Sequence, residues 1–205
     1  MPPAPPQRPH LRERYDSRQQ TVIDRCARVF ATRGYDGTTI DDLIAATGLT
    51  RGGLYHYIGS KAELLTRILQ DLMSPLLSEA AAIVDDESAT ADARLRALVR
   101  IWMGRVASHQ DHIRVFLQER TTLARNAAWG DVRGDRDAFE ALLVRVLREG
   151  VDRGEFVIAD PQLSALALLG MVNHAAVWFG PGRRLSADEV ADGFVDLFLD
   201  GVRAA

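Results

Sequence analysis

Several features that are common in other classes of protein are scarce or missing in this sequence. The 205 residues include one cysteine, Cys26, so the chain forms no internal disulfide and has no cysteine cluster for a structural zinc. No apolar run approaches the about 20 residues that cross a bilayer, and the proline-rich residues 1–15 contain no apolar stretch like that of a signal peptide. These absences predict a protein of the bacterial cytoplasm that has no membrane partner.

Positive charge is concentrated at one end of the chain. The net charge of the whole sequence is −3, and Lys61 is the one lysine among 25 basic residues. Residues 1–62 hold nine basic and six acidic residues (+3), whereas residues 63–205 hold 16 basic and 22 acidic residues (−6). Such asymmetry indicates that the N-terminal segment binds nucleic acid.

No pattern of residues indicates an enzyme. The sequence contains no nucleophile elbow, phosphate-binding loop or dinucleotide fingerprint. His109 and His112 have a spacing at which two imidazoles can share a metal, but no third ligand is close in sequence, and we interpret them as surface or capping residues. Cys26 lies on an apolar helical stripe and is expected to be a packing residue rather than a redox switch. We therefore expect no catalytic residue, no metal site and no cofactor.

Apolar residues recur at helical spacing through almost the whole chain, which predicts an all-α protein. The expected organisation is a flexible proline-rich arm over residues 1–15, a small three-helix domain over 16–62 and a larger helical domain over 63–205. Helices are expected at about 17–33, 39–47, 51–57, 60–84, 89–109, 111–126, 134–153, 161–179 and 187–203. Pro75 is expected to kink or interrupt the helix that contains it.

Two short helices separated by Thr47-Gly48-Leu49-Thr50 have the form of a helix-turn-helix, in which the glycine permits the sharp turn. In this motif the second helix enters the major groove of DNA, and its first residues face the bases. Arg51 can donate two hydrogen bonds to a guanine edge, while Gly52 and Gly53 allow the helix to approach closely. Polar residues nearby are placed to meet phosphates. The predicted DNA-binding residues are Thr39, Thr50, Arg51, Gly52, Gly53, Tyr55, His56 and Lys61.

The segment from Phe30 to Leu65, FATRGYDGTTIDDLIAATGLTRGGLYHYIGSKAELL, resembles the DNA-binding domain of the TetR family of bacterial regulators. The shared pattern is a phenylalanine, a glycine, paired threonines, the turn glycine, Leu-Tyr-His and Ser-Lys-x-Glu-Leu, and it covers roughly residues 17–65. The sequence departs from the family at Ile58, where phenylalanine is common, and at Gly53, where threonine, serine or alanine is more usual. The resemblance implies an all-helical homodimer that binds double-stranded operator DNA.

The resemblance also implies that the last two helices pair with their symmetry mates in a four-helix bundle. The candidate helices, at about 161–179 and 187–203, each carry a stripe of apolar and small residues. The alternative is that both helices pack only within the monomer. The predicted interface residues are Leu163, Ala167, Gly170, Phe194, Leu197, Phe198 and Gly201.

A second resemblance concerns the C-terminal half. The segments VFLQERTTL (115–123), EGVDRGEF (149–156) and WFGPGRRLS (178–186) are similar to a TetR-family branch that represses sterol and fatty-acid breakdown and responds to acyl-CoA thioesters. This resemblance implies a small hydrophobic effector, with an acyl-CoA thioester as the candidate. The predicted pocket residues are Trp102, Met103, Val106, Phe116, Glu119, Arg120, Leu123, Phe139, Val146, His174 and Trp178.

Physical chemistry supports such a pocket without deciding it. An apolar cavity with basic residues at its mouth suits an acyl chain on a phosphorylated carrier, because arginine binds phosphate through paired donors. The arginines considered for that role are Arg120, Arg125, Arg183 and Arg184. The alternative is that the aromatic residues fill the core, that the arginines are solvated, and that Asp111, Arg114 and Glu119 form an ordinary helix face.

The sequence therefore predicts a ligand-responsive transcription regulator, a repressor that leaves a palindromic operator when its effector binds. The helix over 60–84 is the expected mechanical link, because it starts at the DNA-binding domain and ends in the ligand-binding domain. The alternative is a helical enzyme or interaction protein that carries a helix-turn-helix-like head.

Overall fold

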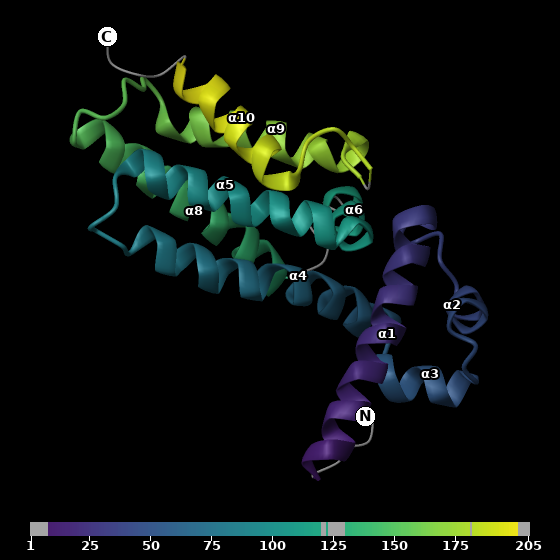
Figure 1. Ribbon diagram of the computed structural model, residues 1–205. Helices are drawn as coiled ribbons and strands as arrows, with labels where there is room; N and C mark the ends of the chain where they lie inside the picture. Colours follow the sequence, from purple (N-terminus) through teal and green to yellow (C-terminus); the bar gives the residue numbers. More distant parts are fainter. Residues whose placement is uncertain (1–7, 120–121, 123–129, 181, 201–205) are drawn as a thin grey trace. The chain divides into compact units, whose positions relative to one another are not determined.

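Residues 8–119, 122, 130–180 and 182–200 are described by the computed structural model, and the statements below concern these residues. Every regular element within them is a helix, which confirms the all-α prediction (Figure 1). The helices are α1 (Pro9–Arg33), α2 (Ile40–Thr47), α3 (Arg51–Ile58), α4 (Lys61–Val84), α5 (Ala91–Ser108), α6 (Gln110–Gln118), α8 (Gly130–Asp152), α9 (Pro161–Trp178) and α10 (Ala187–Asp200). Over the described ranges, no helix has both the length and the apolar character needed to cross a membrane.

The chain folds into two compact units. The first contains residues 1–72 and 111–132, and therefore α1, α2, α3, the first half of α4 and most of α6. The second contains residues 73–110 and 133–205, with the rest of α4, α5, most of α8, α9 and α10. The first unit is larger than the predicted domain over 16–62. The difference arises because the first half of α4 contributes buried leucines to it and because α6, from far along the chain, belongs to it.

The core of the first unit is built around one face of α1. Ile23, Cys26 and Phe30 are at most 1% exposed on this face, and α1 contacts α2 and α3, whose Leu43 and Leu54 are completely buried. Burial of each large apolar side chain contributes about 1.5–3 kcal/mol to stability. Burial also raises the pKa of the Cys26 thiol to about 12, because desolvation penalises the thiolate. The prediction that Cys26 is a packing residue is confirmed.

The first helix begins earlier than the sequence analysis predicted. It starts at Pro9, not near Ser17, so residues 9–15 are helical and are not part of a flexible arm. A proline is well suited to the first turn of a helix, since its missing N–H would have no intrahelical acceptor there. An ion pair of 3.1 Å between Arg12 and Asp16, one turn apart, supports the extension. Residues 1–7 of the predicted arm lie outside the described residues.

Threonines cap both short helices of the helix-turn-helix. Thr39 and Thr50 are the N-caps of α2 and α3, and Gly48 follows α2 in the left-handed region, with φ 71° and ψ 16°. Two expectations further along the chain are corrected. Of the two outcomes expected at Pro75, a kink or an interruption, the interruption does not occur, because α4 continues to Val84. The helix predicted over 111–126 ends earlier than expected, because α6 ends at Gln118 and Glu119 lies in a turn. Residues 120–121 and 123–126 of the predicted range lie outside the described residues.

The second unit is a bundle in which α10 packs on α5 and α9, and α5 packs on α9. Leu95, Leu98 and Val195 are among its buried residues. Ion pairs join the exposed edges of two of these helices. Arg100 donates two hydrogen bonds of 2.8 Å to the carboxylate of Asp192, and these bonds hold the pKa of that carboxyl below its usual value.

A buried arginine fixes one end of the second unit. Arg94, at the start of α5, is 1% exposed. Its Nη1 donates to the carbonyl oxygen of Val84 at 3.0 Å and to Oε2 of Glu149 at 2.6 Å. These bonds join the end of α4, the start of α5 and the end of α8, and the hydrogen bond from Arg94 is the main reason that the pKa of Glu149 is lowered. A guanidinium buried in this way requires its carboxylate partner, because an unpaired buried charge is strongly destabilising.

Candidate nucleic-acid interface

The start of α2 is held by a capping box. The hydroxyl of Thr39 accepts a hydrogen bond from the amide of Asp42 at 3.2 Å, and the carboxylate of Asp42 accepts one from the amide of Thr39 at 2.9 Å. The backbone hydrogen bond from Thr39 is the main reason that the pKa of Asp42 is lowered. Arg33, at the end of α1, also pairs with Asp42. Thr39 therefore fixes the helix that crosses the DNA backbone in a helix-turn-helix.

The first turn of α3 is open to solvent. Arg51 is 60% exposed, and a Cβ added at Gly52 would have no neighbour within 4 Å. A Cβ at Gly53 would come 3.2 Å from the hydroxyl oxygen of Thr50, which accepts a hydrogen bond from the Gly53 amide. Glycine at this position therefore leaves room for the cap, and the surface beyond it is free to approach a DNA groove.

The predicted base-reading side chain already has a partner within the protein. Nη2 of Arg51 lies 2.8 Å from Oδ1 of Asp41, and the Asp41 side chain is 79% exposed. An ion pair between two exposed side chains contributes about 0–1 kcal/mol. The pair can therefore be exchanged at little cost for hydrogen bonds to a guanine edge. The pairing of Asp41 with Arg51 was not predicted from the sequence.

Lys61 joins the start of α4 to the loop between α1 and α2. Its Nζ donates a hydrogen bond of 2.7 Å to the carbonyl oxygen of Thr38 and lies 4.3 Å from the centre of the Tyr35 ring. The ammonium group has three donors, so these contacts leave capacity for a phosphate. The predicted DNA contact thus also has a structural role beside Thr39.

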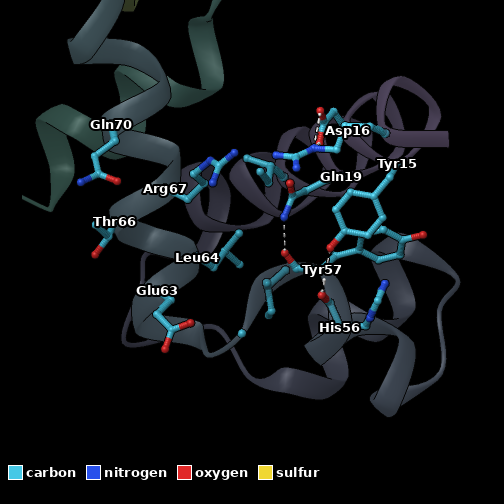
Figure 2. A pocket seen from close by; sticks show the side chains of 14 residues that line it. Tyr15, Asp16, Gln19, His56, Tyr57, Glu63, Leu64, Thr66, Arg67 and Gln70 are labelled. Carbon is cyan, nitrogen blue, oxygen red and sulfur yellow. Dashed lines mark hydrogen bonds and ion pairs between the residues drawn. The ribbon is translucent and has the colours of Figure 1, made fainter. Parts of the chain in front are cut away.

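The first half of α1 holds the end of α3. The hydroxyl of Tyr15 donates to the carbonyl oxygen of His56 at 3.4 Å, and Nε2 of Gln19 donates to that of Tyr57 at 2.9 Å (Figure 2). The Tyr15 ring also packs edge-on against His56, with ring centres 5.4 Å apart. His56 is half-buried and Tyr55 is 36% exposed, so Tyr55 is the more accessible of these two predicted phosphate contacts.

A carboxylate from far along the chain completes the first unit. Oε1 of Glu119 accepts a hydrogen bond of 2.7 Å from the backbone amide of Tyr35, in the loop between α1 and α2. Glu119 is only 5% exposed. Nearby, Nε2 of His112 lies 3.6 Å from Asp24, and Nε of Arg28 lies 3.5 Å from Asp111. The segment from Asp111 to Glu119 is therefore bonded to α1 and to the loop that leads to the Thr39 cap of α2.

Two family models match the chain. The model described as "Bacterial regulatory proteins, tetR family" matches residues 22–68, which include α2 and α3. The model described as "Tetracyclin repressor-like, C-terminal domain" matches residues 88–202, more than half of the chain. The chain belongs to the TetR family. It is therefore a DNA-binding transcription regulator, and the alternative of a helical enzyme or interaction protein is wrong.

Relatives within the TetR family match along most of the chain. HTH-type transcriptional repressor KstR2 of Rhodococcus jostii RHA1 is 28% identical over 186 residues, 90% of this chain and 91% of the relative. AibR, solved in complex with isovaleryl coenzyme A and operator DNA, is 28% identical with a TM-score of 0.77, covering 89% of this chain and 98% of AibR. Ketosteroid transcriptional regulator KstR2 of Mycobacterium tuberculosis has the same fold, with a TM-score of 0.85 at 24% identity and coverage of 92% and 96%.

The predicted effector-pocket residues of this TetR-family protein are divided between the two units. Phe116 and Glu119 belong to the first unit, and the remaining described ones belong to the second. Nε1 of Trp102 donates to Oδ1 of Asn173 at 2.9 Å, and its ring centre lies 5.6 Å from that of Phe139. The buried members of the set are Trp102, Met103, Val106, Phe116, Glu119, Phe139 and Val146. His174 and Trp178 are exposed on α9, and Arg120 and Leu123 lie outside the described residues.

Of the six predicted interface residues that the structure describes, four are exposed, and three of these lie on a stripe of α9. On α9, Leu163, Ala167 and Gly170 are exposed, and Leu166 and Val177 extend the stripe. On α10, Leu197 is 68% exposed, Phe194 and Phe198 are half-buried, and Gly201 lies outside the described residues.

The first testable consequence concerns Glu119. We expect Glu119→Ala to leave the Tyr35 amide without its acceptor, at a cost of about 1–3 kcal/mol. Hydrogen–deuterium exchange should then become faster at the amides of residues 34–39, while exchange in α9 and α10 stays at the wild-type rate. Glu119→Gln retains an acceptor oxygen and serves as the matched control. Unchanged exchange in the loop of the alanine variant would contradict the assigned role.

Proposed function

We propose that this protein is a dimeric repressor whose two helix-turn-helix units bind the half-sites of a palindromic operator. We propose further that an acyl-CoA thioester binds to the second half of the chain and releases the repressor from DNA. The observation that carries the DNA-binding part is the exposed first turn of α3, with Arg51 on open surface beside the cap of α2.

Base reading and phosphate binding fall to different residues in this proposal. Arg51 can present its guanidinium to a guanine, while Thr39, Tyr55, His56 and Lys61 serve as phosphate contacts. Phosphate contacts fix the position of a protein on DNA but are independent of sequence. The two kinds of residue should therefore respond differently to substitution.

Substitution of Arg51 tests the assignment. We expect Arg51→Ala to lose about 1–3 kcal/mol of discrimination at one base pair of each half-site. Lys61→Ala should weaken binding to all sequences about equally and make the salt dependence shallower. Fluorescence anisotropy with fragments of the gene's own upstream DNA, and with single-base variants of the bound fragment, measures both effects. The assignment is wrong if Arg51→Ala leaves the ranking of the base variants as it is in the wild type.

The second-unit surface supports a two-fold interface. Leu163, Leu166 and Val177 are 64%, 47% and 73% exposed and recur at helical spacing on α9, and Leu197 on α10 is similarly exposed. Several large apolar side chains left exposed on neighbouring helices are typical of an interaction surface. A pair of helices that meets its own copy in a symmetric dimer forms a four-helix bundle, as the family resemblance implies.

A charged substitution on this surface should separate the protomers. Leu197→Glu would bury two carboxylates without partners in the dimer, one from each protomer, which is strongly unfavourable. We expect monomers in sedimentation velocity and poor operator binding. Val157→Glu is the matched control, because Val157 is 63% exposed and lies outside α9 and α10. A folded Leu197→Glu variant that remains fully dimeric would place the interface elsewhere.

The effector part of the proposal is supported by the relatives and by the composition of the second half. AibR was solved with isovaleryl coenzyme A and operator DNA, and it covers most of this chain. Trp102, Met103 and Phe139 provide large apolar side chains. Arg183 and Arg184 are exposed between α9 and α10, where a phosphorylated carrier could meet them.

Two helices provide a route from the effector to the DNA-binding residues. Both α4 and α6 continue from one unit into the other, at residues 72–73 and 110–111. Gln110, at the start of α6, donates to the carbonyl oxygen of Phe179 in the second unit at 3.2 Å. Glu119, directly after α6, is bonded to Tyr35 in the first unit. An effector that favours one position of α6 would therefore act on the loop that precedes α2.

Titration of the operator complex tests the effector class. We expect isovaleryl-CoA or a longer acyl-CoA to release the protein from DNA, while the free acid and free coenzyme A release it poorly. The reason is that the acyl chain and the phosphorylated carrier each contribute part of the binding free energy. Equal release by the free acid would indicate a purely apolar effector. No release by any thioester would exclude this effector class.

A further inference from the structure

A groove runs along α1 on the side of the turn between α2 and α3. It has a volume of about 620 Å³, and all the residues that line it belong to the first unit. We call it the α1 groove. Its lining residues are Glu13, Arg14, Ser17, Arg18, Thr21, Val22 and Arg25 of α1 and Thr47 and Leu49 of the turn region.

The charge of the α1 groove is predominantly positive. Three arginines line it against one carboxylate, that of Glu13. Arg14 and Arg18 form no ion pair with any part of the chain that the structure describes. Arg25 donates one hydrogen bond of 3.2 Å, to the carbonyl oxygen of Thr47, which fixes its guanidinium at the end of α2.

A second cavity of the same unit provides a comparison. It has a volume of about 470 Å³ and lies between the first half of α1, the end of α3 and the start of α4 (Figure 2). Its two arginines, Arg12 and Arg67, are both ion-paired, with Asp16 and Asp71. Asp16 and Glu63 also line this cavity, so its formal charge is balanced. Unpaired positive charge is therefore a property of the α1 groove and not of every cavity near α1.

We propose that the α1 groove binds the sugar–phosphate backbone of DNA, so that the DNA contact extends from α3 along α1. Guanidinium groups match phosphate oxygens with paired donors, and Ser17 adds a hydroxyl donor between Arg14 and Arg18. The hydroxyl of Thr21 instead donates to the carbonyl oxygen of Ser17 at 3.0 Å. Arg14 and Arg18 are one helical turn apart, about 6 Å along the axis. They form a line of cations that suits a strand better than an isolated anion. Leu49 immediately precedes Thr50, the cap of α3, so the groove adjoins the predicted base-reading turn.

The inference rests on the proposed operator binding but predicts a separate effect of substitutions in α1. A helix-turn-helix that used only α2, α3 and the start of α4 would be insensitive to substitutions at Arg14 and Arg18. The α1 groove instead adds two phosphate contacts for each protomer, and each contact releases counterions from DNA.

The test compares the salt dependence of operator binding in matched variants of the full chain. The double variant Arg14→Gln/Arg18→Gln should reduce the slope of log K against log salt by about 0.9 for each lost contact, or about 3.6 for a dimer. Arg14→Lys/Arg18→Lys retains the charge and should retain most of the slope. Arg67→Gln/Arg114→Gln is the control, since it removes the same charge from two exposed, ion-paired arginines of the first unit. Arg25 is left intact because it is bonded to Thr47.

A variant that removes negative charge from the groove should strengthen DNA binding, and so distinguishes a phosphate site from general damage to the fold. Glu13→Gln removes the carboxylate of the groove and should increase operator affinity at low salt several-fold. If the Arg14→Gln/Arg18→Gln slope equals that of the control variant while the wild type binds its operator, the inference is wrong and the proposed function stands. Suppose instead that the Arg14→Gln/Arg18→Gln substitution reduces the salt slope for an RNA hairpin as much as for the operator, or that inorganic phosphate competes with the operator for the wild type. The groove would then be a general anion site, and the inference would also be wrong. Absence of operator binding by the wild type would overturn both.

Discussion

The hydrogen bond between the amide of Tyr35 and the carboxylate of Glu119 is the contact on which the organisation of the DNA-binding unit depends. It spans 84 residues of sequence and brings the end of α6 to the loop between α1 and α2. The same loop receives Lys61 from the start of α4, through the carbonyl oxygen of Thr38 and the ring of Tyr35. Two of the helices that continue into the second unit, α4 and α6, therefore have one end bonded to the same short loop, and that loop sets the position of the α2 cap.

This arrangement explains how a small displacement of α4 or α6 can affect the residues that are predicted to bind DNA. Thr39 is at once the last residue of the loop, the cap of α2 and a predicted DNA contact. A loop held from two sides has little freedom to absorb a movement of either helix, because packed interiors shift between discrete arrangements more readily than they deform. The exposed ion pair between Asp41 and Arg51, unlike the contacts of the loop, contributes little to stability. It can therefore be replaced by contacts with DNA, which leaves the Arg51 side chain available for recognition.

The sequence was sufficient for the local features of the fold. Thr39, Thr50 and Gly48 mark helix ends through their own backbone and side-chain chemistry, so the helix-turn-helix could be located from them. Contacts between distant segments could not be predicted in this way. Nothing in the sequence near Glu119 indicates that its carboxylate caps an amide in the first unit, and its helical spacing was equally typical of an exposed face. The early start of α1 was missed because five nearby prolines suggested an arm, whereas Pro9 occupies the position where a helix accepts one.

The burial of Cys26 has a practical consequence for experiments on this molecule. Thiol-directed reagents attack the thiolate, and a pKa of about 12 leaves almost none of it at neutral pH. Cys26 is the one cysteine of the chain, so a second cysteine placed on the surface would be the single reactive position in each protomer. A spin label or fluorophore attached there would form a symmetric pair in a dimer. The distance between the two labels would then report the separation of the DNA-binding units directly, with no need to remove the native thiol from the core.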